Sequence, residues 1–204
     1  MFTGIVTDIG KIIAVSPMKE GKRLRVMTAY DISTMNVGCS IAHGGICLTV
    51  VNLSQDDSTD GNWYEVEAWE ETLCRTNISS WDVGTHINLE RSLKLEDELG
   101  GHLVSGHVDG TVEIISLDVI ESSMRCRLSL PNSLKKFIAV KGSVCLDGVS
   151  LTVNSVREES FDILLIHHTL EKTVWSMRKV GDFVNIEVDS IARYISRLFE
   201  LTIA

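Results

Sequence analysis

The stretch SIAHGGICLTV at residues 40–50 recurs as SVCLDGVSLTV at residues 143–153. Five of the eleven aligned pairs are identical, and two more exchange isoleucine for valine. After a shared glycine both copies alternate apolar with polar residues, which is the pattern of a half-buried strand that follows a turn. Because an internal repeat decides the architecture of a chain, this pair of stretches predicts a fold that is built twice.

The repeat extends in both directions from this stretch. Residues 72–90 align with residues 169–187, and eight of the nineteen pairs are identical. Upstream, residues 4–6 align more weakly with residues 106–108. The offset falls from 103 to 97 along the chain, and a polar insertion at residues 55–62 accounts for the drop. The composition of that insertion indicates a surface loop.

Each half contains several short runs of strand type, many of which alternate apolar and polar residues. Five or six strands in a half of roughly 95 residues predict a small closed antiparallel barrel, because closure removes the exposed edges of a sheet. Short helical turns are expected at residues 31–35 and 133–139. The strand-like runs are residues 10–15, 24–28, 46–53, 63–69 and 86–90, and then 111–115, 125–130, 149–156, 161–166 and 183–188.

The tail has a different period from the two repeats. Apolar residues recur there at spacings of three and four, which predicts an amphipathic helix over residues 190–204. Asp189 or Ser190 can cap it. A helix this apolar requires a partner surface, which is either the protein's own barrels or an oligomer interface. We therefore expect a first barrel at 1–93, a linker at 94–102, a second barrel at 103–189 and a helix at 190–204.

Composition excludes several classes of protein. The 204 residues are 44% hydrophobic and 23% charged, with a formal net charge of -9. That balance disfavours binding to nucleic acid or to an anionic membrane, since both require a basic surface. There is no apolar run of membrane-spanning length, and the N-terminal residues are not typical of a signal peptide. Five cysteines without a Cys-x-x-Cys spacing favour reduced thiols, and we expect neither a disulfide framework nor a metal site.

Eight short motifs lie along the chain, namely MFTGIV at 1–6, CLTV at 47–50, ETL at 71–73, RTN at 75–77, GGH at 100–102, SGH at 105–107, DGVSLTV at 147–153 and VNIEVD at 184–189. Taken together, these motifs resemble those of the riboflavin synthase family. They cover both halves in order. The resemblance implies two six-stranded Greek-key barrels and a C-terminal trimerisation helix in a cytoplasmic homotrimer. Each active site would lie between the N-terminal barrel of one subunit and the C-terminal barrel of its neighbour.

The resemblance also implies a transferase reaction, the last step of riboflavin biosynthesis. Two molecules of 6,7-dimethyl-8-ribityllumazine would dismutate into riboflavin and 5-amino-6-(D-ribitylamino)uracil, with two substrates per site and without a cofactor or metal. Association with lumazine synthase is a further partner to be expected. A non-catalytic lumazine- or flavin-binding protein of the same fold is the alternative. A flavin reductase barrel is disfavoured, because its Arg-x-[Tyr/Phe]-[Ser/Thr] stretch does not occur.

Substrate-binding residues follow from the resemblance, position by position. The N-terminal pocket would use a backbone wall at residues 4–6, a strand at 47–49 and a second strand segment at 67–72. Its residues would be Gly4, Ile5, Val6, Cys47, Leu48, Thr49, Glu67, Ala68, Trp69, Glu70, Glu71 and Thr72. The C-terminal pocket would use the equivalent positions, namely Gly106, His107, Val108, Lys141, Ser150, Leu151, Thr152, Ile166, His167, His168, Thr169, Leu170 and Glu171.

The repeat refines the catalytic candidates Cys47, Ser150, His107 and Asp189. Cys47 aligns with Ser150, so the position requires a small and weakly polar side chain, whether or not it reacts. His107 aligns with Ile5, which makes it an asymmetric titratable group and a candidate general acid or base. Asp189 either caps the final helix or also reaches the site.

Two histidine pairs and three departures from the family complete the sequence-based expectations. On a strand, His102 and His107 would point to opposite faces and form a poor metal pair, and adjacent His167 and His168 would also point apart. The chain departs from the family at Gly44, where asparagine is frequent, and at Cys74, where arginine is frequent. It also has Val174-Trp175 where small polar residues are frequent.

Overall fold

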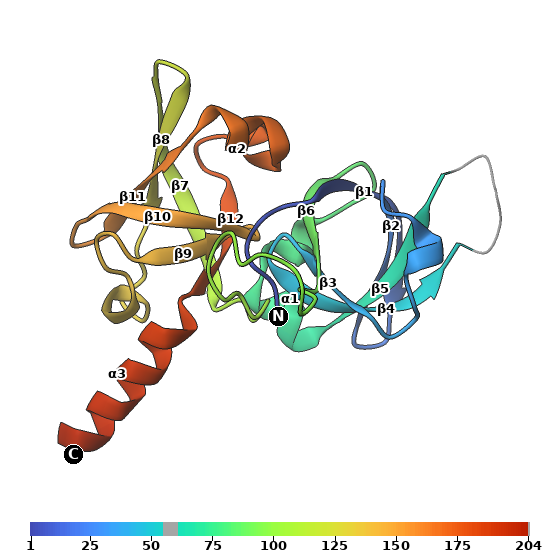
Figure 1. The fold of residues 1–204 in the computed structure, drawn as a ribbon, viewed down its shortest axis with the longest axis horizontal. Coiled ribbons are helices and arrows are strands. Elements are labelled where there is room, and N and C mark those ends of the chain that lie inside the picture. The colour runs from blue at the N-terminus through green and yellow to red at the C-terminus, as the bar shows by residue number, and fades with distance from the viewer. Residues whose placement is uncertain (55–60, 204) are drawn as a thin grey trace.

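Two closed six-stranded antiparallel barrels form the body of the protein (Figure 1). The computed structural model describes residues 1–54 and 61–203. The strand order of the first barrel is β1-β2-β5-β4-β3-β6, and that of the second repeats it with every number raised by six. The prediction of two duplicated barrels is therefore confirmed. Most of the predicted surface loop at 55–62 lies outside the described residues.

The elements follow one another in the same order in both halves. The first barrel contains β1 (Asp8–Met18), β2 (Gly21–Met27), η1 (Ile32–Thr34), β3 (Ser40–His43), β4 (Ile46–Leu53), β5 (Trp63–Trp69), α1 (Glu70–Arg75), η2 (Asn77–Ser80) and β6 (His86–Arg91). The second contains β7 (Gly110–Ile120), β8 (Ser123–Ser129), η3 (Lys135–Phe137), β9 (Ser143–Leu146), β10 (Val149–Val156), β11 (Ser160–Leu165), α2 (His167–Lys172), η4 (Val174–Met177) and β12 (Phe183–Val188).

Strands β4, β5, β10 and β12 have the bounds expected from their alternation. Strands β3 and β9 were not predicted as separate runs. Each is only four residues long and is joined by a two-residue turn to the strand that follows it, so neither is long enough to show a period of its own. They complete the barrels by pairing with β6 and β12 respectively.

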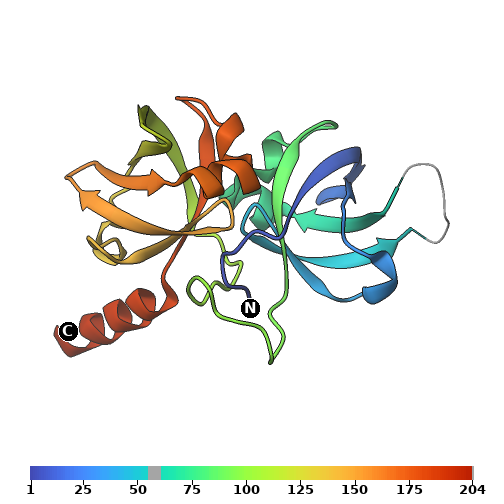
Figure 2. The same ribbon diagram turned by 45° about the horizontal axis from the view of Figure 1, so that its top comes forward.

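Each barrel has its own apolar core, which the inward-facing residues of its six strands supply. A third, smaller cluster lies between the barrels and contains Phe2, Ala42, Val104 and Cys145. In it Phe2 and Val104 form an antiparallel bridge, with Phe2 N–H donating to the Val104 oxygen (2.7 Å) and Val104 N–H donating to the Phe2 oxygen (3.0 Å). The N-terminal segment accordingly runs between the barrels (Figure 2).

Two duplicated asparagines join the barrels. The amide of Asn88 on β6 donates to the Asp147 oxygen (2.8 Å), and that of Asn185 on β12 donates to the Gly44 oxygen (2.9 Å). Their side-chain oxygens accept from Val174 N–H and Asn77 N–H respectively, each at 2.8 Å. Buried polar groups are thus satisfied reciprocally across the interface. The identity of these asparagines in the repeat therefore has a structural reason.

One departure from the family is explained at the same interface. Asp147 is buried and forms an ion pair with Arg178. Burial raises the pKa of Asp147, and Arg178 opposes that rise. At the duplicated positions stand Gly44 and Trp81, and a Cβ on Gly44 would lie 3.2 Å from the Trp81 ring. The second barrel therefore has a charged pair where the first has an indole against a glycine.

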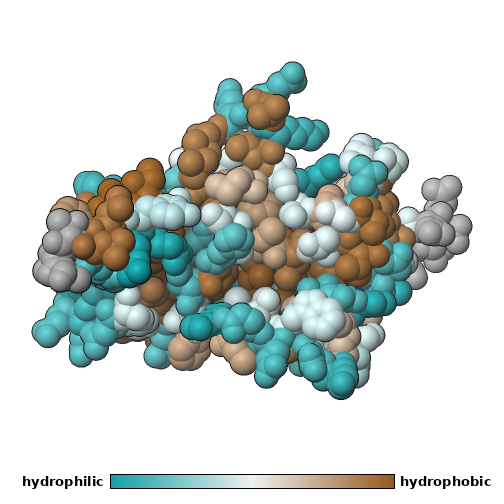
Figure 3. Space-filling view, turned by 90° about the horizontal axis from the view of Figure 1, so that it is seen from below, coloured by the Kyte–Doolittle hydropathy of each residue, from teal (hydrophilic) through white to brown (hydrophobic). Residues whose placement is uncertain are grey.

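The predicted C-terminal helix is confirmed as α3 (Ser190–Ile203), and Asp189 caps it by accepting from Ile191 N–H (2.9 Å). The helix extends away from the second barrel (Figure 1). Its apolar side chains are exposed, including Tyr194 (71%) and Phe199 (63%), and they gather at one end of the molecule (Figure 3). Packing on the chain's own barrels does not cover this face.

The first barrel contains a buried polar pair that the second lacks. His43 Nδ1 contacts the Ile41 oxygen (2.9 Å), and Nε2 contacts the Tyr64 hydroxyl (2.8 Å). Burial lowers the pKa of His43 to about 4, from 6.5. The tautomer that satisfies both contacts is neutral, with Nδ1 as donor and Nε2 as acceptor. Leu146 and Phe161 occupy the duplicated positions.

We expect the free energy of unfolding to fall as the pH drops from about 6.5 to about 4. In that window the unfolded chain protonates His43 and the folded chain does not, which costs about 2 kcal/mol by about pH 5. Tyr64→Phe leaves Nε2 without its donor and should cost about 1–3 kcal/mol at neutral pH. Urea unfolding of each protein at about pH 7 and about pH 5 measures both effects.

The matched control is the double variant His43→Leu/Tyr64→Phe, which copies the pair Leu146 and Phe161 from the second barrel. It should lose less stability on acidification than the unmodified protein does. An unchanged acid response in the double variant would contradict the assignment of the effect to His43.

Candidate active site

The short segments at residues 4–6 and 106–108 cross between the barrels. Cys47 N–H, at the start of β4 in the first barrel, donates to the Gly106 oxygen (2.9 Å). Ser150 N–H, at the start of β10 in the second barrel, donates to the Gly4 oxygen (2.8 Å). We call residues 3–6 the N-terminal arm and residues 105–108 the linker arm. Each arm lies against a strand of the opposite half.

This crossing corrects one sequence-based expectation. Gly4, Ile5 and Val6 were grouped with Cys47, and Gly106, His107 and Val108 with Ser150, because each set belongs to the same half of the chain. The structure exchanges the two sets. Sequence proximity could not reveal the exchange, since hydrogen bonds between distant segments decide it.

Left-handed glycines make the close contacts possible. Gly4 has φ +75° and Gly106 has φ +79°, a region that residues with a Cβ adopt only at a cost. A Cβ on Gly4 would lie 2.6 Å from the Ser150 Cβ, and one on Gly106 would lie 2.5 Å from the Cys47 Cβ. Each arm therefore approaches its strand as closely as backbone allows.

A cavity of about 390 Å³ opens beside Cys47. It brings together Cys47, Glu71, Thr72 and the linker arm, which were predicted for two different pockets. Its further wall residues were not predicted. The complete lining consists of Ile46, Cys47, Glu71, Thr72, Arg75, Thr76, Gly106, His107, Val108 and Asp109. We call this the first pocket. We use the name second pocket for the surface that the duplicated positions around Ser150 form with the N-terminal arm, where Ser150 N–H meets the Gly4 oxygen.

The segments that follow β5 and β11 are helical, which corrects a second expectation. The second strand segment ends at Trp69, and Glu70, Glu71 and Thr72 begin helix α1. In the same way the predicted strand residue Ile166 is the N-cap of α2, which contains His167, His168, Thr169, Leu170 and Glu171. The two histidines are therefore neighbours on one helical turn. A helix of six residues is too short to show its period in sequence.

The predicted residues differ in what they can present to a ligand. Leu48, Leu151 and Ala68 turn into the barrel cores, so only their backbone can contact a ligand. Thr49 and Thr152 are exposed on the outer face. Apolar Trp69 (53% exposed) and Ile166 (56%) stand at duplicated positions, as the N-cap residues of α1 and α2.

Two of the predicted charged residues, Glu67 and Glu171, contact other side chains, and a third, Lys141, lies away from Ser150. Glu67 accepts from Arg23 (2.6 Å). Glu171 lies 3.4 Å from His167 on the same helix. Lys141 is exposed in a left-handed turn (φ +68°), where its N–H donates to the Val153 oxygen (2.8 Å). Lys141 therefore lies beyond the part of β10 that carries Ser150.

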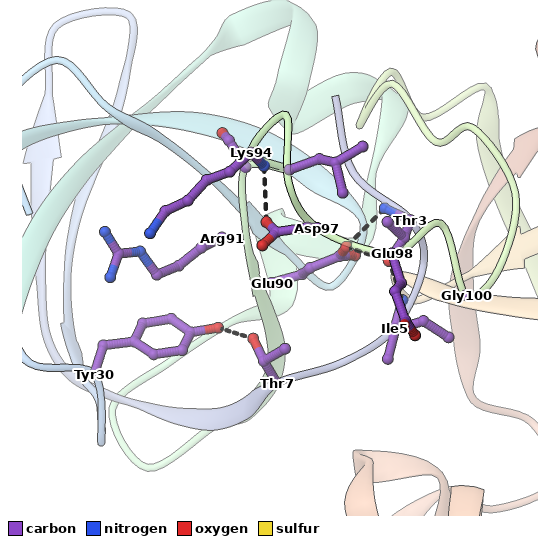
Figure 4. Close-up of a pocket in the computed structure, with 12 residues that line it drawn as sticks. Thr3, Ile5, Thr7, Tyr30, Glu90, Arg91, Lys94, Asp97, Glu98 and Gly100 are labelled. Atoms are coloured by element: carbon purple, nitrogen blue, oxygen red, sulfur yellow. Dashed lines mark hydrogen bonds between the residues drawn. The ribbon is translucent and has the colours of Figure 1, made fainter.

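Two duplicated glutamates hold the arms, and sequence reasoning assigned them no role. Glu90 accepts from Thr3 N–H (2.6 Å), Thr3 Oγ1 (2.7 Å) and Gly4 N–H (2.9 Å), as Figure 4 shows for Thr3. Glu187 accepts from Ser105 N–H (2.7 Å) and His107 N–H (2.8 Å). Burial raises the pKa of both carboxyls, and these donors oppose the rise. Glu90 and Glu187 are identical at aligned positions of the repeat, and this identity was the feature of the sequence that could have indicated their role.

His102 is a third residue to which sequence reasoning assigned no role in the site. It lies on an irregular segment and not on a strand, so the opposite-face argument about His102 and His107 does not apply. Its Nδ1 lies 2.7 Å from the Ser150 hydroxyl, and its Nε2 is buried without a hydrogen-bond partner among the described residues. Burial lowers the pKa of His102, and Asp189 opposes this. His102 has no assigned partner in the repeat, so the repeat gave no signal for it.

His107 and Asp189 are placed differently. His107 is exposed at the wall of the first pocket and is fixed through its backbone by Glu187. Asp189 caps α3 and influences His102 electrostatically. Among the described residues there is no cluster of three or more His, Cys, Asp and Glu side chains arranged to hold a metal ion. No helix within the described ranges is long and apolar enough to span a membrane.

The comparisons with known proteins agree with this architecture. A model of the lumazine binding domain family matches residues 3–92 and 105–189, once in each half. The riboflavin synthase of Brucella abortus (strain 2308) is 58% identical over 97% of this chain and 98% of its own. That of Photobacterium phosphoreum is 40% identical over 97% and 88% respectively.

Solved structures show the same fold. A crystal structure of LumP complexed with riboflavin matches with a TM-score of 0.81 at 21% identity, over 92% of this chain and 99% of that one. The duplicated barrels and matched domains place this chain among the lumazine-binding proteins. Within them, it belongs to the riboflavin synthase family, whose members are transferases.

Gly106→Ala tests the crossed contact. We expect it to lower the free energy of unfolding by more than Gly84→Ala does, and to accelerate amide hydrogen exchange at Cys47. Both variants incur the left-handed strain of about 1–2 kcal/mol. Only Gly106 has a neighbour within 4 Å of the added Cβ, since Gly84 (φ +97°) faces open space. Equal losses in the two variants would contradict the crossing.

Proposed function

We propose that the protein dismutates two molecules of 6,7-dimethyl-8-ribityllumazine. One molecule gives a four-carbon unit to the other, and the products are riboflavin and 5-amino-6-(D-ribitylamino)uracil. The observation that carries the proposal is the pair of duplicated strand starts, Cys47 and Ser150, each of which is faced by an arm from the other half. A reaction that consumes two copies of one substrate requires two similar binding surfaces, and the duplicated strand starts support this requirement.

The substrate supplies much of the chemistry. The 7-methyl protons of such a lumazine are acidic, because the carbanion delocalises into the ring. Holding two molecules face to face in a water-excluded site then lowers the barrier by several kcal/mol through proximity and orientation. A positioned acid or base adds about 10²–10⁴-fold. Alignment is therefore the main requirement on the protein.

The residues divide between alignment and proton transfer. Backbone groups of the two arms and of the β4 and β10 strands hydrogen-bond the ring carbonyls and nitrogens, and exposed hydroxyls such as Thr49 and Thr152 hold the ribityl chain. Trp69 and Ile166 provide apolar contact to the rings. His107 is positioned to exchange protons in the first pocket. Cys47 and Ser150 are equivalent polar contacts and neither is required as a nucleophile.

The second pocket has its own polar pair. The Ser150 hydroxyl and His102 Nδ1 share a hydrogen bond of 2.7 Å, so a ligand group beside Ser150 can be polarised through the imidazole. Asp189 orients this region from the cap of α3. The remaining predicted residues, including Lys141 and the exposed side chains of α1 and α2, act at the rim.

An oligomer explains why both pockets are open. Exposed Ile5, Trp69 and Ile166 leave apolar surface beside the two pockets, which a reaction that requires dryness must cover. We propose a homotrimer that is joined through the exposed face of α3. In it the first pocket of one subunit faces the second pocket of its neighbour.

The setting of the reaction follows from the same proposal. No cofactor takes part, because the four-carbon unit passes directly between the two substrates. The five cysteines are unpaired thiols, which suits the reducing cytoplasm. Association with lumazine synthase remains a proposed partnership, to be tested by co-sedimentation of the two proteins.

Turnover without any addition is the direct test. Purified protein incubated with 6,7-dimethyl-8-ribityllumazine should increase riboflavin absorbance and release the pyrimidine product in a ratio of about 1:1. Chelator-treated protein should turn over at the same rate. Tight binding of the lumazine without product would instead support the non-catalytic binding protein.

Phe199→Asp tests the role of α3. A charge on the exposed apolar face should dissociate the trimer and remove most activity, since each site would lose its covering barrel. Arg197→Ser on the same helix is the control and should leave both unchanged. Sedimentation and turnover measured on the same samples check this, and a fully active monomer would refute the intersubunit site.

A further inference from the structure

The segment His107–Asp109 separates two cavities. On one side lies the first pocket. On the other side lies a separate cleft of about 550 Å³ at the base of α3, which is distinct from the second pocket. Its wall includes the same three residues together with Glu187, Arg193 and Tyr194. A shift of this segment therefore changes both cavities at once.

Asp109 fixes the end of the segment. Its N–H donates to the Ile186 oxygen (2.8 Å), and its Oδ2 accepts from Val188 N–H (2.9 Å). Arg193 on α3 adds a two-pronged contact, with Nη1 to Oδ1 at 2.7 Å and Nη2 to Oδ2 at 2.9 Å. The Asp109 side chain is only 12% exposed. A bidentate pair in this setting fixes orientation as well as distance.

Within the described residues, α3 is held near both of its ends, and Arg193 contacts the segment that lines the first pocket. Asp189 caps the helix, and Arg193 N–H donates to the Asp189 oxygen (3.2 Å). Near the far end, Glu200 forms an ion pair with Lys136. A change in the position of α3 thus reaches the linker arm through Arg193 and Asp109.

The duplicated position shows that this arrangement belongs to one pocket. Thr7 aligns with Asp109, and its hydroxyl lies 2.5 Å from the Tyr30 hydroxyl. In the part of the chain that the structure describes, Thr7 accordingly has no arginine contact of this kind. The bidentate pair therefore acts on the linker arm, which carries His107. The N-terminal arm, which carries Ile5, is held by Glu90.

We propose that Arg193 is a positioning residue that sets the linker arm through Asp109 and so couples the seating of α3 to the first pocket. The proposal rests on the proposed function for its kinetic readout. Arg193 touches no reacting atom. It acts by fixing the side chain of Asp109, and Asp109 lies only two residues after His107 on the same segment.

A double-mutant cycle tests this role. The proteins are wild type, Arg193→Met, His107→Ala and the double variant, with Arg197→Met as the control on the same helix, where Arg197 lies 3.3 Å from Glu200. Arg193→Met should lower kcat about 10–100-fold, the range expected for misplacement of a site element. It should do so without changing the oligomeric state. Arg193→Lys should recover only part of the loss.

The cycle distinguishes positioning from general stability. If Arg193 acts through the arm, Arg193→Met should cost much less in the His107→Ala background, whereas independent effects multiply. Multiplicative losses, or a change in oligomeric state with Arg193→Met, would overturn the proposal.

A binding measurement covers failure of the proposed function. Titration with 6,7-dimethyl-8-ribityllumazine requires no turnover, and the same non-multiplicative pattern should appear in Kd. If the wild-type protein formed no riboflavin in the turnover assay, the proposed function alone would be refuted. If the Kd values were the same in the wild type and the Arg193 variants, the coupling would be refuted.

Discussion

The reciprocal contact between each arm and the strand of the other half is the constraint on which the structure depends. Cys47 N–H on the Gly106 oxygen and Ser150 N–H on the Gly4 oxygen place backbone against backbone. Only glycine permits this approach at a positive φ. Glu90 and Glu187 then hold each arm from its own barrel. The two pockets exist because these contacts bring residues of both halves together.

The repeat and the alternation of apolar residues were sufficient to predict two barrels and a final helix. Strand β4 was predictable, because its buried and more exposed residues alternate from Ile46 to Val50, before the register shifts between Val50 and Asn52. The six-residue helices α1 and α2 were not, since Trp69 and Ile166 continue a strand-like pattern up to their first residue. Length limited the prediction there, and not an unusual interaction.

The site was less predictable than the fold, for a different reason. Candidate residues such as Cys47, Ser150 and His107 could be chosen, but their grouping required knowledge of which half each arm contacts. His102 could not be chosen from the repeat, because it has no aligned residue in the first half and contacts Ser150, which is 48 positions away. The repeat identifies residues that both halves share, and it gives no signal for a residue such as His102 that occurs in one half only.

The exchange of arms also bears on the descent of the chain. Equivalent segments that cross between equivalent domains form the arrangement of a domain-swapped dimer, here contained in one polypeptide. Fusion replaces a concentration-dependent association with a permanent one. It also frees each copy to change by itself, as Asp147 with Arg178 and Gly44 with Trp81 have done. A symmetric dimer of single barrels would have had to accept every such change twice.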